Sequence, residues 1–256
     1  MRQRGKGWTP AGPWWLKLAW GPLVRGVLLP CENHKTQTPR EAEPFRQSMT
    51  KTKSTEPEAL ISPVLVLAHD YVQRVLLPGD LAVDATVGNG HDTFFLAHCV
   101  GSAGKVIGCD IQPIALRQAE ARLRAAGVLE RVELLLLGHE QLAHWLTSAT
   151  PGVRVKAAMF NLGYMPGADH SLITRAETTI TALESMLTLM AQGGVITAVL
   201  YSGHPGGWAE TRAVLDWVYA LPPGCASFSI FQPQHTRKAA PLLVAITPTA
   251  GNLEGD

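Results

Sequence analysis

The chain has 256 residues, of which 46% are hydrophobic, 17% charged and 7% aromatic. This composition is typical of a globular protein with a buried core and excludes a mainly disordered chain. The sequence contains no run of about 20 uncharged apolar residues, which argues against a transmembrane helix. The four cysteines form no C-x-x-C pair, a pattern that excludes a zinc ribbon or a disulfide scaffold and fits a reducing compartment.

Charge is distributed unevenly along the chain. Residues 1–53 hold ten Lys or Arg and three acidic residues, a net charge of +7, whereas residues 54–256 hold 12 basic and 18 acidic residues, a net charge of −6. We therefore expect an irregular basic extension over residues 1–53 and one folded domain over residues 54–256. The extension is interpreted as dispensable or as the product of a mis-assigned start, with Met49 as the alternative first residue. A targeting segment, or an RNA-binding or membrane-surface tail, are the other interpretations.

Hydrophobic spacing and Gly or Pro breaks predict alternating helices and strands from residue 64 onward. The predicted order is helix 64–77, strand 81–87, helix 92–100, strand 105–109, helix 113–126, strand 131–137, helix 140–146, strand 155–160, helix 176–190, strand 195–200, helix 208–220, strand 225–231 and strand 242–247.

Strands that alternate with helices imply right-handed crossovers and a parallel sheet covered on both faces. The last two predicted strands have no helix between them, so we expect an antiparallel hairpin at one edge. The predicted fold class is therefore α/β, with a Rossmann-like, mostly parallel seven-stranded sheet and an antiparallel edge hairpin. This is the element order of class I methyltransferases.

Glycines and an acidic residue follow the first two predicted strands. Gly88 and Gly90 allow a tight turn and close approach of the backbone to a ligand. Asp110 ends the second strand, 20 positions after Gly90, where a carboxylate can accept hydrogen bonds from both hydroxyls of a ribose. Together these residues predict a nucleoside-binding site.

The residues around this turn distinguish between nucleoside cofactors. A dinucleotide fingerprint has a third glycine where this chain has Thr93. Asp92 would repel a phosphate at the start of the following helix, whereas Asp84 and Asp92 suit the positive charge of a sulfonium. We therefore predict S-adenosylmethionine as the cofactor. The alternative is that Asp92 only caps a helix and the glycines only form a turn.

Polar residues also follow the third and fourth predicted strands. His139 and Glu140 stand where an adenine edge would be contacted, although helix capping is an equal alternative for His139. The fourth strand runs into Asn161 and, three residues later, Tyr164. Amino-group methyltransferases carry an Asn/Asp-Pro-Pro-aromatic motif at this place. The Asn carbonyl can hold an amine, and the aromatic ring can stack on a base; a simple Gly/Pro turn is the alternative.

Two later segments add polar residues at loop positions. Residues 201–207 follow the fifth strand, and residues 232–238 join the last two strands. The second loop could offer basic side chains to a phosphate backbone, or it is only a polar hairpin loop. The remaining helical histidines are interpreted as structural: His69, His98 and His144. No metal-ligand spacing and no G-x-S-x-G elbow is present.

Five motifs occur in a specific order along the chain. They are Asp84-Ala85-Thr86-Val87-Gly88-Asn89-Gly90-His91-Asp92-Thr93, Asp110-Ile111-Gln112, Phe160-Asn161-Leu162-Gly163-Tyr164-Met165-Pro166-Gly167, Glu177-Thr178-Thr179-Ile180 and Gly203-His204-Pro205-Gly206-Gly207. Over about residues 61–248 the sequence resembles the bacterial family once described as rRNA methylases and now regarded as tRNA 5-aminomethyluridine methyltransferases.

The resemblance implies an activity and a set of site residues. It implies methyl transfer from S-adenosylmethionine to the exocyclic amine of 5-aminomethyl(-2-thio)uridine at the tRNA wobble position, in the anticodon loop, by a cytoplasmic homodimer. The candidate catalytic residues are Asn161 and Tyr164. The candidate cofactor-binding residues are Asp84, Gly88, Asn89, Gly90, His91, Asp92, Thr93, Asp110, Gln112, His139, Glu140 and Asn161. The candidate substrate-binding residues are Tyr164, Gly203, His204, Gly206, Gly207, His235, Arg237 and Lys238.

The chain departs from the family near its end, and other functions stay open. The family usually has an Asn followed shortly by Pro-Pro before the last strand, where this chain has residues 237–241, Arg-Lys-Ala-Ala-Pro. No strong general base is evident, so Asp84, Asp92 or a water molecule are the candidates for the proton acceptor. The alternatives are methylation of rRNA or of a small-molecule amine, or a non-enzymatic subunit that binds the cofactor or RNA.

Overall fold

In the computed structural model of the protein, the structure describes residues 62–163, 174–234 and 239–249. The expected extension over residues 1–53 lies outside these ranges. The elements in chain order are α2 (Pro63–Val75), β1 (Leu81–Asp84), α3 (His91–Cys99), β2 (Lys105–Asp110), α4 (Pro113–Ala125), the 3-10 helix η1 (Leu129–Arg131), β3 (Val132–Leu136), α5 (His139–Ala149), β4 (Val155–Leu162), α6 (Ala176–Leu189), β5 (Met190–Leu200), α7 (Gly207–Tyr219), β6 (Ala226–Phe231) and β7 (Leu242–Pro248).

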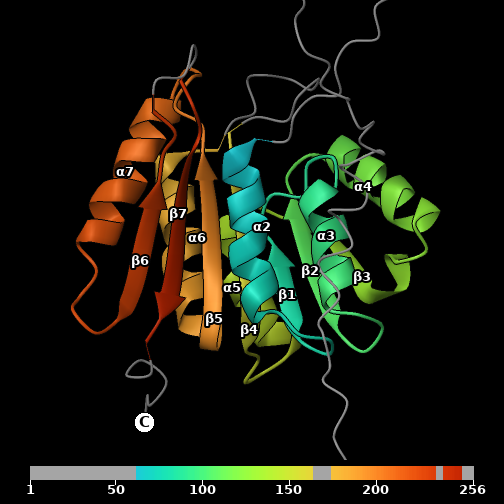
Figure 1. Ribbon diagram of the computed structural model, residues 1–256. Coiled ribbons are helices and arrows are strands. Elements are labelled where there is room, and N and C mark those ends of the chain that lie inside the picture. The colour runs from blue at the N-terminus through green and yellow to red at the C-terminus, as the bar shows by residue number, and fades with distance from the viewer. Residues whose placement is uncertain (1–61, 164–173, 235–238, 250–256) are drawn as a thin grey trace, which may run out of the picture. The chain divides into compact units, whose positions relative to one another are not determined.

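The strands form one seven-stranded sheet with the order β3-β2-β1-β4-β5-β7-β6 (Figure 1). Strands β1 to β5 are mutually parallel where they pair, and β7 runs antiparallel to both β5 and β6. The predicted fold class, including the antiparallel hairpin at one edge, is confirmed. Because β7 lies between β5 and β6, β7, the second strand of the hairpin, joins the hairpin to the rest of the sheet.

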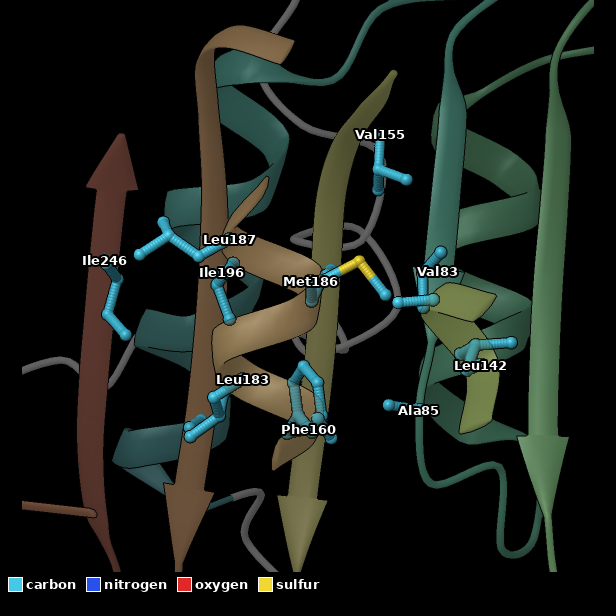
Figure 2. Close-up of a cluster of buried hydrophobic side chains, with 14 of the residues drawn as sticks. Val83, Ala85, Leu142, Val155, Phe160, Leu183, Met186, Leu187, Ile196 and Ile246 are labelled. Carbon is cyan, nitrogen blue, oxygen red and sulfur yellow. The ribbon is translucent and has the colours of Figure 1, made fainter. Parts of the chain in front are cut away.

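Alternating side chains place a hydrophobic core on each face of the sheet. Val83 of β1 and Phe160 of β4 belong to the cluster covered by α5, α6 and α7, which Figure 2 shows in close-up. Ala82 and Met159, one position away, belong to the cluster on the opposite face, together with residues of α2, α3 and α4. This period of two is the strand pattern, and burial of each large apolar side chain contributes about 1.5–3 kcal/mol.

Two strand boundaries differ from the prediction by three residues or more. β1 ends at Asp84 rather than at residue 87, because the backbone then turns toward α3. β5 starts at Met190 rather than at residue 195 and includes Gly194, where an added Cβ would lie 2.7 Å from the carbonyl oxygen of Lys156. The glycine therefore allows close approach of β4 to β5, where the register shifts between Val155 and Ala157.

None of the helices in the described part of the chain has the length and apolar character that crossing a bilayer requires.

Candidate active site

The strand order defines where a ligand would bind. β1 pairs with β2 on one side and with β4 on the other, so the crossovers leave β1 in opposite directions. In open α/β sheets this switch point creates a crevice at the carboxyl ends of the strands. The carboxyl ends of β1, β2, β4 and β5 lie along this edge (Figure 1), and the predicted motifs lie at or next to these ends in sequence.

The turn after β1 depends on glycine at two positions. Gly88 has φ +48° and Gly90 has φ +75°, and the Gly90 N–H donates to the Val87 carbonyl oxygen at 2.7 Å. A Cβ on Gly90 would lie 2.7 Å from Cβ of Ala119 on α4, whereas a Cβ on Gly88 would meet nothing nearer than 3.9 Å. Gly90 therefore lets α3 start against α4, and Gly88 leaves open space above the turn.

Asp110 at the end of β2 connects two backbone segments. Its Oδ2 accepts the Gly88 N–H at 2.9 Å, and its Oδ1 accepts the Gln112 N–H at 2.9 Å. An ionised carboxylate has about four acceptor sites, so two remain for the hydroxyls of a ribose. Gln112 itself is buried, 8% exposed, at the N-cap of α4. The predicted sugar-binding aspartate thus also fixes the glycine turn.

Asp84 is fully buried beside this turn. Its Oδ1 accepts the Thr86 N–H at 3.1 Å, and its Oδ2 accepts the Thr93 hydroxyl at 2.5 Å. Burial, followed by repulsion from Asp92, raises the pKa of Asp84 to about 7. A cation bound between the carboxylates of Asp84 and Asp92 would reduce the repulsion between them. The sulfonium predicted from the sequence is such a cation. Thr93 is itself completely buried, and its hydrogen bond holds the Asp84 carboxylate in one orientation.

Asp92, in the first turn of α3, connects three elements. Its Oδ2 accepts a hydrogen bond from Nδ2 of Asn161 at 3.3 Å, and its Oδ1 lies 2.7 Å from Nε2 of His69 on α2. The Asn161 N–H donates to the Thr86 hydroxyl at 2.7 Å. Because the amide nitrogen of Asn161 faces Asp92, its carbonyl oxygen is free to face a substrate amine. Asp92 is not the N-cap of α3, since Gly90 holds that position.

The contact of His69 with Asp92 changes the interpretation of this histidine as structural. It bridges 23 positions in sequence, so no local motif could have predicted it. The one available signal is its place at the border of the buried stripe of α2, next to Ala68.

Arg122 of α4 is a second residue that sequence reasoning missed. Its Nε donates to the Asn89 carbonyl oxygen at 2.8 Å, and an outer guanidinium nitrogen lies 3.1 Å from Nε2 of His91. Burial and the nearby Arg122 charge lower the pKa of His91. Arg122 therefore holds the predicted Asn89–His91 segment in place.

The segment after β3 places His139 and Glu140 at the start of α5. Nε2 of His139 lies 3.3 Å from the Thr178 hydroxyl oxygen of α6, and burial lowers the pKa of His139. An imidazole that stays neutral can present a hydrogen bond to a base edge. Glu140 folds back over Gly138 and accepts from the Gln141 amide at 3.3 Å, so it is positioned at the rim.

The segment after β5 lies against the end of β4. A Cβ built on Gly163 would lie 3.5 Å from Nε2 of His204 and 3.6 Å from Cδ2 of Tyr201. A Cβ on Gly207 would collide with the Tyr201 carbonyl oxygen and lie 2.7 Å from Nε2 of His204. The His204 ring therefore sits between Gly163 and Gly207, near Asn161, and Gly203 reaches the β6–β7 connection, where its Cβ would lie 3.6 Å from Ala239.

Glu210 of α7 anchors this part of the site and was not predicted. It is 3% exposed and accepts hydrogen bonds from the hydroxyls of Thr174, at 2.7 Å, and Thr179, at 2.6 Å. The Thr174 N–H donates to the Gly163 carbonyl oxygen at 3.1 Å. Glu210 thus holds Thr174 next to α6, and Thr174 in turn bonds to Gly163 at the end of β4. The Thr178-Thr179 pair in the quoted motif is the sequence signal for this anchor.

Four predicted site residues lie outside the described residues: Tyr164, His235, Arg237 and Lys238. Within the described ranges, no group of three His, Cys, Asp or Glu side chains is arranged to hold a metal ion.

The donor set of the crevice fits S-adenosylmethionine. Asp110 retains acceptor sites for a ribose, Gly88 leaves room above the turn, and the carboxylates of Asp84 and Asp92 offer negative charge to a sulfonium and an amino group. None of these groups offers the positive charge that a dinucleotide phosphate needs.

Comparisons with known proteins agree with this fold and site. The model of a family described as "Putative rRNA methylase" matches residues 106–247, more than half of the chain. The chain is 35% identical over 189 residues to the chloroplastic tRNA (mnm(5)s(2)U34)-methyltransferase of Arabidopsis thaliana, a match that covers 70% of this chain and 66% of that protein. The chain therefore spans just under two thirds of the length of this relative.

Two solved structures match almost over their full length. One is described as a putative rRNA-methylase from Clostridium thermocellum, at 38% identity and a TM-score of 0.69, covering 73% of this chain and 98% of that one. The other is described as a putative methyltransferase from Streptococcus mutans in complex with SAH, at 34% identity and a TM-score of 0.66, covering 74% of this chain and 99% of that one.

Fold, site and comparisons together define a class I S-adenosylmethionine-dependent methyltransferase. Within that class, the chain belongs to the rRNA methylase family whose model it matches. The resemblance noted from the sequence motifs is thereby confirmed.

Proposed function

We propose that this protein methylates the exocyclic amine of 5-aminomethyl(-2-thio)uridine at the wobble position of tRNA. The observation that carries the proposal is the placement of Asn161 at the carboxyl end of β4, with its amide nitrogen held by Asp92 and its backbone N–H on Thr86. This leaves the amide oxygen of Asn161 as an acceptor for an amine. The name of the Arabidopsis thaliana relative gives the matching substrate for that protein.

The side chains of this site would act mainly by orientation. Bound S-adenosylmethionine supplies the electrophilic methyl group on its sulfonium. Asn161 accepts a hydrogen bond from the amine and directs the nitrogen lone pair, while Asp92 keeps the amide of Asn161 from rotating. Correct alignment of two reacting groups lowers the barrier by several kcal/mol. Tyr164 is proposed to stack on the base, and the 203–207 loop to enclose the amine.

Mass spectrometry of nucleosides tests the substrate. Deletion of the gene should cause 5-aminomethyl(-2-thio)uridine to accumulate in tRNA, with the N-methylated nucleoside lost. Complementation by the wild type should restore methylation, whereas Asn161→Ala should not, although the purified variant should still bind S-adenosylmethionine. Unchanged wobble nucleosides, with a methyl group lost from rRNA or a small amine instead, would refute the proposal.

We further propose a homodimer that works on the anticodon loop in the cytoplasm, with residues 1–53 outside the methyltransferase domain. The resemblance to the family supports these points. Light scattering of the purified protein tests the dimer. A chain that starts at Met49 should retain methylation, and loss of activity in that shortened chain would assign a role to the preceding residues.

A further inference from the structure

The proposed reaction needs a proton acceptor. An alkylamine is largely protonated near neutral pH, as a lysine side chain is, and an ammonium has no lone pair with which to attack a methyl group. A sulfonium beside the ammonium lowers the pKa of the amine through repulsion of like charges. The released proton must still leave the crevice, and Asn161 cannot bind it as a base.

Asp92 is the carboxylate best placed to take that proton. It is only 8% exposed, and its Oδ2 lies 3.3 Å from Nδ2 of Asn161, the residue that would hold the amine. Both partners of Asp92 are side chains, whereas each of the other two carboxylates of the crevice accepts at least one backbone N–H. Asp84 accepts a backbone N–H and the Thr93 hydroxyl in the interior, and Asp110 accepts two backbone N–H groups at the ribose position.

His69 connects Asp92 to solvent. Its Nε2 lies 2.7 Å from Oδ1 of Asp92, and its ring stacks on Phe95 with centroids 3.9 Å apart and planes inclined by 3°. The side chain of His69 is 29% exposed, compared with 11% for that of Asp92. One edge of the ring therefore contacts the buried carboxylate, while the ring itself reaches the surface, and the stack on Phe95 fixes its orientation.

We infer that Asp92 and His69 form a proton relay from the substrate amine to solvent, an inference that rests on the proposed function. The ammonium gives one proton to Asp92, which passes it from Oδ1 to Nε2 of His69 in its Nδ1–H tautomer, and the imidazolium then releases the proton on Nδ1 to water. The freed lone pair forms the new N–C bond as the C–S bond breaks and its electron pair goes to sulfur. The product leaves as a secondary ammonium with its two remaining protons. His69 acts through Asp92 and is a positioning residue.

Charged and titratable groups around the relay come from each element that packs there. His91 faces the pair from α3, Asp84 from β1 and Tyr201 from the segment after β5; the proximity of Asp92 contributes to the raised pKa of both Asp84 and Tyr201. β7, which also packs on α2, contains no titratable residue.

Single-turnover methylation measured against pH tests the relay. His69→Gln keeps a side chain that can form a hydrogen bond with Asp92 but cannot take up a proton, and His69→Phe keeps the stack on Phe95. Both should bind S-adenosylmethionine within about threefold of wild type, and both should methylate about 100-fold more slowly at pH 7, a typical loss for a missing acid or base. The deficit should shrink as pH rises toward 9, because the amine then arrives neutral. His144→Gln, an exposed histidine of α5, is the matched control and should match wild type at every pH.

Three results would overturn the relay, and they are distinguishable. Wild-type rates and an unchanged pH profile in both His69 variants would show that His69 carries no proton. An equal loss at all pH values would assign it a purely structural role. A wild-type enzyme that does not methylate 5-aminomethyluridine in tRNA would remove the proposed function itself, and the relay with it. If one variant fails to fold, as thermal unfolding would show, the other decides.

Discussion

Replacement of Gly90 by alanine tests whether the glycine turn, α3 and α4 form one rigid support for the cofactor. At φ +75° an L-residue loses about 1–2 kcal/mol relative to its right-handed conformation. The added Cβ would also lie 2.7 Å from Cβ and 2.8 Å from Cα of Ala119. Forcing a methyl group into such a space costs about 1–3 kcal/mol more. We therefore expect Gly90→Ala to lower the free energy of unfolding by about 2–5 kcal/mol.

Gly127→Ala provides the matched control. Gly127 ends α4 with φ +66°, and a Cβ there would meet nothing within 4 Å. This variant should lose only the conformational contribution, about 1–2 kcal/mol, and the effect of alanine on the unfolded chain is common to both variants and cancels in the comparison. Urea unfolding gives both free energies, and calorimetry gives the affinity for S-adenosylmethionine, which only Gly90→Ala should weaken. If both variants were equally destabilised and both kept their affinity for S-adenosylmethionine, the contact of Gly90 with α4 would not determine the conformation of the turn.

Four further predictions concern charge and anchoring. Because burial raises the pKa of Asp84 to about 7, affinity for S-adenosylmethionine should rise from pH 6 to 8 with proton release, while affinity for S-adenosylhomocysteine, which lacks the sulfonium charge, should change less; titration calorimetry in two buffers measures both. The same raised pKa makes the contribution of Asp84 to the stability of the free protein complete below about pH 4 and lost as pH rises through 7, and a pH series of thermal unfolding should show this decline. Asp110→Asn loses a charged acceptor for two backbone N–H groups, so its Kd should rise about 10- to 100-fold; an unchanged Kd contradicts the assignment. Glu210→Gln weakens the contacts with the hydroxyls of Thr174 and Thr179, so methylation of RNA should slow while cofactor affinity stays the same; parallel loss of both would mean a general folding defect.

The sequence predicted the parts of the fold that depend on local periodicity. Alternation of strands and helices gave the parallel order, and the absence of a helix between the last two strands gave the antiparallel edge. Strand ends were less accurate, because Gly194 signals a helix end in sequence but allows close strand packing in the structure. Because glycine has no side chain, the sequence does not distinguish between a helix end and close packing of two strands.

The candidate site was predicted where a motif and a strand end coincide, as at Asp84, Asp110 and Asn161. It was incomplete where a contact joins distant helices. His69 meets Asp92 from 23 positions away, and Glu210 meets Thr179 from 31 positions away. Such pairs are set by how α2 and α7 pack on the sheet, and periodicity alone shows only that each helix has a buried stripe.

The position of α2 has a consequence for how the chain acquires its site during synthesis. This helix, which precedes every strand in sequence, packs against β5 and β7, and β7 is the last strand to leave the ribosome. Domains fold as units once their sequence is available, and pairing of distant segments is slow. The nascent chain therefore cannot bring His69 to its final place until β7 has been synthesised, so competence to bind substrate should arise later than the formation of the individual helices.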